Sequence, residues 1–223
     1  MPGYQVKVET VTVGGTDYAI RSLLDSNQYS DPDGEAELAG ISPASWPLFG
    51  QLWPSARVLA RVMNEKDLVD KRILEIGAGL ALASLVVHQR AGNITVSDLH
   101  PLSSSFLDEN LRLNDLGPLK YETGNWATSN PALGIFDLII GSDVLYERIH
   151  PAMVAGFISR HSAPDAEVII VDPDRGNRPQ FRREMQALGY THSEVRAARL
   201  LENGLSYKGC ILRFSRSVRI TLS

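Results

Sequence analysis

Short apolar segments alternate with longer amphipathic ones from residue 54 to residue 188, and this alternation constrains the fold more than any other feature. Apolar runs of strand length lie at residues 72–76, 94–97, 119–123, 135–141 and 167–171. Helical spacing of apolar residues follows Pro54 at 56–63 and recurs at 80–90, 102–113, 153–161 and 179–188. Strands that alternate with helices of this length are typical of a parallel sheet covered by helices on both faces.

Two further β segments lie outside this alternating region. Residues 4–24 alternate around Gly14-Gly15, which predicts a β-hairpin with a tight turn. Residues 25–45 are polar and rich in turn residues, which indicates a loop or lid. Residues 192–200 and 205–214 flank Glu202-Asn203-Gly204, a second hairpin signal. The prediction is an α/β fold with a seven-stranded, mostly parallel sheet, a C-terminal antiparallel hairpin, and an N-terminal β-hairpin and lid.

Composition excludes several classes of function. The chain has 223 residues, 43% of them hydrophobic, and a net charge of −4. That charge argues against binding nucleic acid by bulk charge, because phosphate contacts need a basic surface. No apolar run reaches the roughly 18 residues of a membrane span, and the N-terminus lacks a secretory pattern. We therefore expect a cytoplasmic protein with no membrane partner.

Cysteine and histidine give no sign of a metal site. Cys210 is the single cysteine, so an internal disulfide is impossible, and we expect it to be a small buried residue of a late strand. The five histidines show no metal-ligand spacing, and we predict no metal. His88 is expected to be structural within a helix, and His100 is expected at the surface.

The first strand of the alternating region ends in Glu75-Ile76-Gly77-Ala78-Gly79. Glycines two residues apart permit a tight turn and let a ligand approach the backbone. In a dinucleotide-binding turn, the position of Leu82 is occupied by a third small residue, glycine or alanine. Leu82 therefore argues against binding of NAD. Glu75 ends a buried strand and needs a cation or donor there, a need that the amino group of a methionine-like ligand would meet.

The second strand ends in Asp98, 19 residues after Gly79. A carboxylate at that edge of an α/β sheet can accept hydrogen bonds from both hydroxyls of a ribose. A helix cap for the segment that starts near Pro101 is the alternative, and the two roles are compatible.

Three more segments place polar or aromatic residues after strands. Asp143 ends the strand at 135–141, and Tyr146 lies one helical turn further on; a helix cap with a packed tyrosine is the alternative. Trp126 stands in a polar loop, where a tryptophan usually covers something apolar, in the protein or in a ligand. Asp172-Pro173-Asp174-Arg175 follows the fifth strand, but a capped turn explains it equally well, so these residues stay outside the predicted site.

Together these motifs resemble the class I S-adenosylmethionine-dependent methyltransferases. More specifically, the chain is similar to bacterial members of the branch that contains the lysine methyltransferases of non-histone proteins. The resemblance spans roughly residues 46–214 and rests on Trp53-Pro54, Leu74 to Gly79, Asp98, Asn114, Trp126 and Ser142-Asp143-Val144-Leu145-Tyr146. It implies a Rossmann-like methyltransferase domain at 46–223, preceded by the hairpin and lid at 1–45. Ala81 departs from the family, which often has glycine there.

The resemblance also implies roles for individual residues. S-adenosylmethionine would be the cofactor, with Trp53 bordering its methionine end and the turn from Glu75 through Gly77, Ala78 and Gly79 beneath it. Asp98 would hold the ribose, Asn125 and Trp126 would flank the adenine, and Ser142 would line the pocket. Asp143 and Tyr146 would face the acceptor and orient an amine that must arrive neutral.

The acceptor implied by the resemblance is a protein lysine side chain. A small-molecule amine is an alternative with the same chemistry. An NAD-binding oxidoreductase and a non-catalytic cofactor-binding module are alternatives of a different class.

Overall fold

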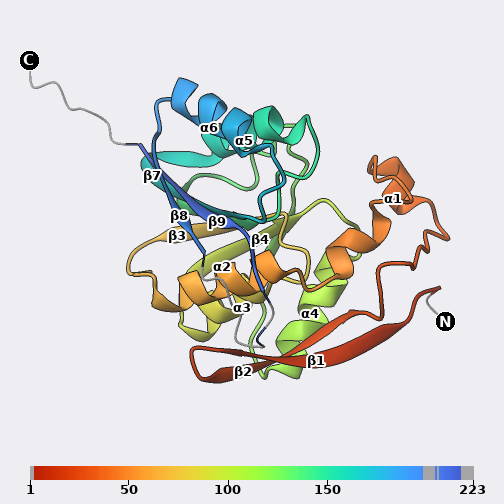
Figure 1. The fold of residues 1–223 in the computed structure, drawn as a ribbon. Helices are drawn as coiled ribbons and strands as arrows, with labels where there is room; N and C mark the ends of the chain where they lie inside the picture. Colours follow the sequence, from red (N-terminus) through yellow and green to blue (C-terminus); the bar gives the residue numbers. More distant parts are fainter. Residues whose placement is uncertain (1–2, 198–203, 205, 217–223) are drawn as a thin grey trace, which may run out of the picture.

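The computed structural model of the chain describes residues 3–197, 204 and 206–216, and it is built around a seven-stranded sheet (Figure 1). The strand order is β5-β4-β3-β6-β7-β9-β8. The bounds of these strands are β3 Arg72–Ile76, β4 Asn93–Asp98, β5 Lys120–Thr123, β6 Phe136–Ser142, β7 Ser162–Asp172, β8 Thr191–Arg196 and β9 Cys210–Ser215. The five strands from β5 to β7 are mutually parallel, and β9 and β8 pair antiparallel, which confirms the predicted α/β fold.

The central strands end level with one another, and this creates the edge at which the candidate site lies. Ile76 at the end of β3 pairs with Ser97 of β4 on one side and with Gly141 of β6 on the other. The residues that follow β3, β4 and β6 therefore emerge at one edge of the sheet, as expected for open α/β sheets.

Helices cover both faces of the sheet (Figure 1). One face carries α2, α3 and α4, which share a buried apolar cluster with residues of the N-terminal hairpin. The opposite face carries α5 and α6, which form a second cluster. The bounds are α2 Pro54–Glu65, α3 Leu82–Gln89, α4 Ser103–Leu113, α5 His150–His161 and α6 Arg178–Ala187.

Several boundaries differ from those predicted. Strand β7 begins at Ser162 instead of residue 167, because its pairing with β6 shifts register between Phe136 and Leu138. Helix α5 begins at His150, with Pro151 in its first turn. Helix α3 begins at Leu82, after Ala81 takes a left-handed backbone conformation. The predicted turn residues Glu202 and Asn203 lie outside the described residues.

The predicted N-terminal hairpin is present as β1 (Val6–Val13) and β2 (Thr16–Leu23), which pair antiparallel. It lies against α4 (Figure 1), and two asparagine amides of α4 and its C-terminal end bind the backbone of β2. Asn114 exchanges two 2.8 Å hydrogen bonds with the backbone of Ala19, and Asn110 accepts a 2.7 Å hydrogen bond from the amide of Arg21. The asparagines thus satisfy backbone groups of β2 that no neighbouring strand covers.

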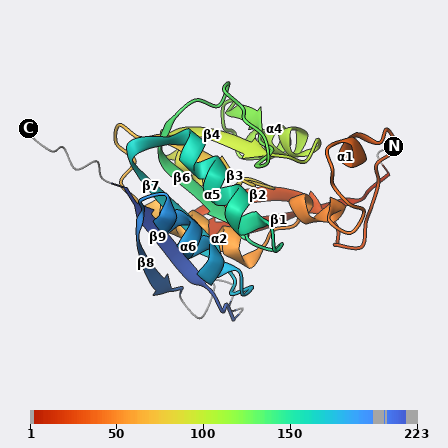
Figure 2. The same ribbon diagram turned by 90° about the horizontal axis from the view of Figure 1, so that it is seen from above.

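Residues 25–50 contain the short helix α1 (Glu35–Leu38) and the 3-10 helix η1 (Trp46–Gly50). The α1 segment projects from the body of the molecule next to η1 (Figure 2). Trp46 is fully buried and contacts Phe49 edge to face, so this segment is anchored in the core at its C-terminal end. In the described part of the chain, no helix has the length and apolarity needed to cross a membrane.

Candidate active site

The glycine turn after β3 is the most constrained part of the site. Gly77 and Gly79 both adopt left-handed backbone conformations, with φ of 55° and 54°. A Cβ added at Gly77 would lie 2.9 Å from Val144 and 3.0 Å from the Trp126 ring, and one at Gly79 would lie 2.8 Å from the Phe49 carbonyl oxygen. Only glycine fits these positions, and the segments after β5 and β6, together with η1, meet around the turn.

Glu75 lies fully inside the protein behind this turn. Its Oε2 accepts a 2.9 Å hydrogen bond from the amide of Ser84 and a second hydrogen bond from the Ser84 hydroxyl. The predicted need for a donor is therefore met by the first turn of α3. Burial raises the pKa of Glu75 from its ordinary 4.5 to about 7, although the Ser84 hydrogen bonds oppose this shift.

This raised pKa predicts a pH-dependent stability. Between about pH 4.5 and pH 7 the folded protein keeps the Glu75 proton while the unfolded chain has lost it, so stability should fall as pH rises through this window. The loss attributable to Glu75 should reach about 3 kcal/mol. Glu75→Gln should remove this component in urea denaturation of the ligand-free protein. Equal pH slopes for wild type and variant would show that Glu75 does not titrate in this range.

Asp98 clamps the glycine turn to the end of β4. Its Oδ2 accepts a 2.8 Å hydrogen bond from the amide of Gly79, and its Oδ1 accepts one of 2.8 Å from the amide of His100. Helix α4 has Leu102 as its N-cap residue, so the helix-cap alternative for Asp98 is wrong. Burial raises the pKa of Asp98, and the two amide hydrogen bonds oppose that rise. Each carboxylate oxygen retains a lone pair for a further donor.

His100 is buried, and the surface position predicted for it is wrong. Only 3% of its surface is exposed, and its ring stacks on Phe49 of η1 with 3.7 Å between ring centroids. Burial lowers the pKa of His100 to about 4, which the Asp31 carboxylate partly opposes, so the imidazole is neutral at physiological pH. The imidazole thus serves as a flat surface on which η1 packs.

Asn125 and Trp126 follow β5, as predicted. Asn125 fixes the turn, because its Oδ1 accepts a 2.9 Å hydrogen bond from the amide of Ala127. Trp126 is half-buried, packs against the α5 face of the sheet and meets the His150 ring at right angles, with 5.2 Å between ring centroids. The Trp126 ring therefore faces both the protein core and the glycine turn.

Two further predicted residues, Trp53 and Ser142, lie at the start of α2 and at the end of β6. Trp53 is the N-cap residue of α2, and its indole Nε1 donates a 2.8 Å hydrogen bond to the Leu48 carbonyl oxygen. It thereby ties η1 to the start of α2. Ser142 is the half-buried last residue of β6.

Asp143 makes an ion pair that sequence reasoning missed. Its backbone is left-handed, with φ of 54°, and its amide donates a 2.8 Å hydrogen bond to the Val171 carbonyl oxygen. Its carboxylate binds Arg175 in a two-pronged pair, with Nε–Oδ1 at 2.6 Å and Nη2–Oδ2 at 2.8 Å. Ile149 is the N-cap residue of α5, so the cap alternative for Asp143 is also wrong. The signal was available in principle, because Arg175 follows β7 at the same sheet edge.

Tyr146 lies beside His150, with ring centroids 4.4 Å apart, and 40% of its surface is exposed. Burial, followed by the charges of Asp98 and Glu147, raises the pKa of Tyr146 to about 12. The phenol is therefore a neutral group that can donate a hydrogen bond.

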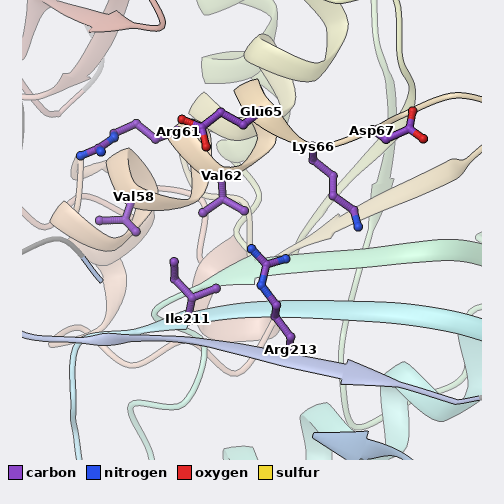
Figure 3. Close-up of a pocket in the computed structure, with 8 residues that line it drawn as sticks. All are labelled: Val58, Arg61, Val62, Glu65, Lys66, Asp67, Ile211 and Arg213. Carbon is purple, nitrogen blue, oxygen red and sulfur yellow. The ribbon is translucent and has the colours of Figure 1, made fainter. Parts of the chain in front are cut away.

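A groove of about 410 Å³ lies elsewhere, between α2 and β9 (Figure 3). It is lined by Val58, Arg61, Val62, Glu65, Lys66, Asp67, Ile211 and Arg213. None of the predicted site residues lines it. The candidate site is therefore defined by the convergence of residues at the strand ends and not by this groove.

Comparison with known proteins identifies the family. A family model described as lysine methyltransferase matches residues 48–186, well over half of the chain. The chain belongs to the lysine methyltransferase family. The match includes every residue predicted for the site, from Trp53 to Tyr146.

Individual relatives of the chain are protein methyltransferases. It is 27% identical over 152 residues to the protein N-lysine methyltransferase METTL21A of Xenopus tropicalis, covering 65% of this chain and 69% of that protein. It is 32% identical over 105 residues to the histone-arginine methyltransferase METTL23 of Xenopus laevis, covering 43% and 44% of the two chains. Its fold matches magnesium protoporphyrin IX methyltransferase of Synechocystis, solved with bound S-adenosylmethionine, with a TM-score of 0.56, 19% identity and coverage of 72% and 76%.

The chain is accordingly an S-adenosylmethionine-dependent methyltransferase, and its residues fit that cofactor. The turn at Gly77 and Gly79 has no room for a Cβ, so no side chain extends from either position over the turn. Asp98 keeps free lone pairs beside it, and both hydrogen bonds that the structure gives Glu75 go to Oε2. Asp98 thus supplies acceptors for ribose hydroxyls at this edge, and Glu75, buried behind the turn, has Oε1 left for a further donor.

Proposed function

We propose that this methyltransferase acts on a protein lysine side chain at the edge where β3, β4 and β6 end. The observation that carries the proposal is the meeting of the glycine turn with the segment after β6. Val144 and Trp126 both contact the space over Gly77, and Asp143 and Tyr146 flank Val144 in the chain. Residues suited to the cofactor and residues suited to an acceptor thus share one space. The name of METTL21A as a protein N-lysine methyltransferase supports the same acceptor.

On the cofactor side, we assign each predicted residue a role. S-adenosylmethionine supplies a methyl group bonded to a positively charged sulfur, which is a good leaving group. Asp98 accepts hydrogen bonds from the ribose hydroxyls, and Glu75 attracts the ammonium group of the methionine end. Asn125 and Trp126 flank the adenine, while Trp53 and Ser142, with the backbone of Ala78, border the remaining surface.

On the acceptor side, the residues must present a neutral amine. A lysine ammonium has no lone pair, so its proton must leave before the nitrogen can bond to carbon. Asp143 accepts a hydrogen bond from the incoming amine, and Tyr146 stays a neutral phenol that orients it. Both residues position the nitrogen and leave the cofactor to provide the reactive carbon.

Methyl labelling of a cell lysate tests this proposal. Lysate proteins should acquire label from S-adenosylmethionine when the wild-type enzyme is added, and fragmentation by mass spectrometry should place it on lysine. A separate reaction with the low-molecular-mass filtrate of the same lysate serves as the comparison. Label confined to the filtrate would favour the small-molecule amine, and label on arginine would assign a different protein acceptor.

A further inference from the structure

The loops that follow β6 and β7 are joined into one unit. The amide of Asp143 donates to the Val171 carbonyl oxygen, and the Asn177 amide Nδ2 donates a 2.7 Å hydrogen bond to the Leu145 carbonyl oxygen. The Arg175–Asp143 ion pair lies between these two connections. The conformation of the segment after β6, which contains Asp143 and Tyr146, therefore depends on the loop after β7.

Arg175 is fixed at both its backbone and its guanidinium. Asp172, which is fully buried, accepts hydrogen bonds from the amides of Asp174 and Arg175 at 2.8 and 3.3 Å. The guanidinium uses Nε and Nη2 to bind Asp143. The Arg175 side chain is 41% exposed and that of Asp143 is 9% exposed, so the cation lies toward solvent and the carboxylate toward the interior. Because both the backbone and the guanidinium of Arg175 are already fixed, little further conformational entropy is lost when a substrate binds.

We infer that Arg175 is a positioning residue that keeps the acceptor amine in its neutral form, acting through Asp143. This inference rests on the proposed function. A lone carboxylate next to a lysine would stabilise the ammonium and raise its pKa. A carboxylate already paired with a guanidinium stabilises it far less, and the guanidinium itself disfavours a second cation close by. Asp143 can then accept a hydrogen bond from the amine without trapping the protonated form.

The order of events follows from this arrangement. The ammonium releases its proton to water as the lysine enters the site. The neutral nitrogen then forms a bond to the methyl carbon, and the carbon–sulfur bond breaks with its electron pair remaining on sulfur. Arg175 and Asp143 exchange no proton in this sequence, because both stay charged.

Other charged and titratable groups lie near Asp143, Tyr146 and Arg175 and also influence their charges. A test of Arg175 must leave these groups unchanged. They come from the strand ends β4 and β7, the segment after β6, helices α5 and α6, and the residues before β9. These groups are Asp98, Tyr146, Glu147, His150, Asp172, Arg178 and Tyr207. None of them is changed by substitution of Arg175.

The pH profile of Arg175→Gln tests the inference. Single-turnover rates with saturating cofactor and a lysine acceptor, taken from the labelling experiment, report the pKa of the bound amine. Loss of the guanidinium should move the rising limb of the profile up by about one pH unit. The variant should be about tenfold slower than wild type on that limb, equal to it at high pH, and no weaker in acceptor binding.

Three further variants separate this role from a structural one. Arg175→Lys retains the charge and should keep most of the wild-type profile. If the glutamine variant does not fold, Arg175→Met takes its place as the variant that removes the charge. Asn177→Ala loosens the same loops without changing charge and should leave the limb in place. Arg182→Gln removes an exposed arginine of α6 and should leave it in place as well.

The outcomes are distinguishable. A wild-type enzyme that labels no lysine would overturn the proposed function, and this inference with it. A wild-type enzyme that labels lysine, combined with an Arg175→Gln variant that is slowed equally at every pH, would overturn the inference alone.

Discussion

Asp143→Ala is expected to lower the rate of methyl transfer by about 10²–10⁴. The carboxylate lies at the end of β6, is only 9% exposed, and is held in place by Arg175. An interaction with the amine that matters mainly in the transition state should lower kcat and kcat/KM together. The Kd for S-adenosylhomocysteine should stay within a few fold of the wild-type value, because the Asp143 carboxylate is assigned to the acceptor and not to the cofactor.

The controls for Asp143→Ala separate chemistry from stability. Asp165→Asn removes an exposed carboxylate near the start of β7, away from the site, and should retain full activity. Thermal unfolding of each variant reports any loss of folding. An Asp143→Ala protein that is less stable yet fully active would show that Asp143 only shapes the loop.

Asp98→Ala is expected to weaken binding of S-adenosylhomocysteine tenfold or more. The two hydrogen bonds from the ribose hydroxyls to this charged acceptor are worth about 1.5–3 kcal/mol each. The variant also loses the hydrogen bond from the amide of Gly79 that fixes the turn. Calorimetric titration measures the change directly. Because Gly79 and His100 both lose an acceptor, stability should fall as well, by about 1–3 kcal/mol for each orphaned amide.

A second variant separates these two effects at Asp98. Asp98→Asn keeps one oxygen acceptor and should therefore be the more stable variant, while it still loses much of the affinity. Circular dichroism at the titration temperature confirms that each variant is folded. Wild-type affinity in a folded Asp98→Ala protein would mean that this carboxylate serves only to hold the glycine turn.

The strands of the sheet were predictable because burial imposes a regular apolar pattern on each element. The runs at 72–76 and 135–141 match β3 and β6 within one residue at each end. The glycine turn was predictable for a related reason, since Gly77 and Gly79 occupy left-handed positions with no room for a side chain. The early start of β7 was not, because it depends on a register shift against β6.

The polar contacts within the site were harder to predict. Arg175 and Asp143 lie 32 residues apart, and their pairing depends on the conformations of two loops that have no periodic pattern. His100 is a polar residue in a loop, and its burial follows from the packing of Phe49, which comes from a distant part of the chain. Asp98 was predicted as a ligand residue, but its hydrogen bond to Gly79 requires the three-dimensional turn. Such contacts depend on loop geometry, whereas strand positions depend on local composition.

A crystal structure of the enzyme with S-adenosylhomocysteine tests the location of the site most directly. The account predicts ligand density at the ends of β3, β4 and β5, with the ribose on Asp98, the backbone of Gly77 and Gly79 beneath the ligand, and Trp126 beside the adenine. Density in the groove between α2 and β9, or a ligand that makes no contact with Asp98, would contradict it.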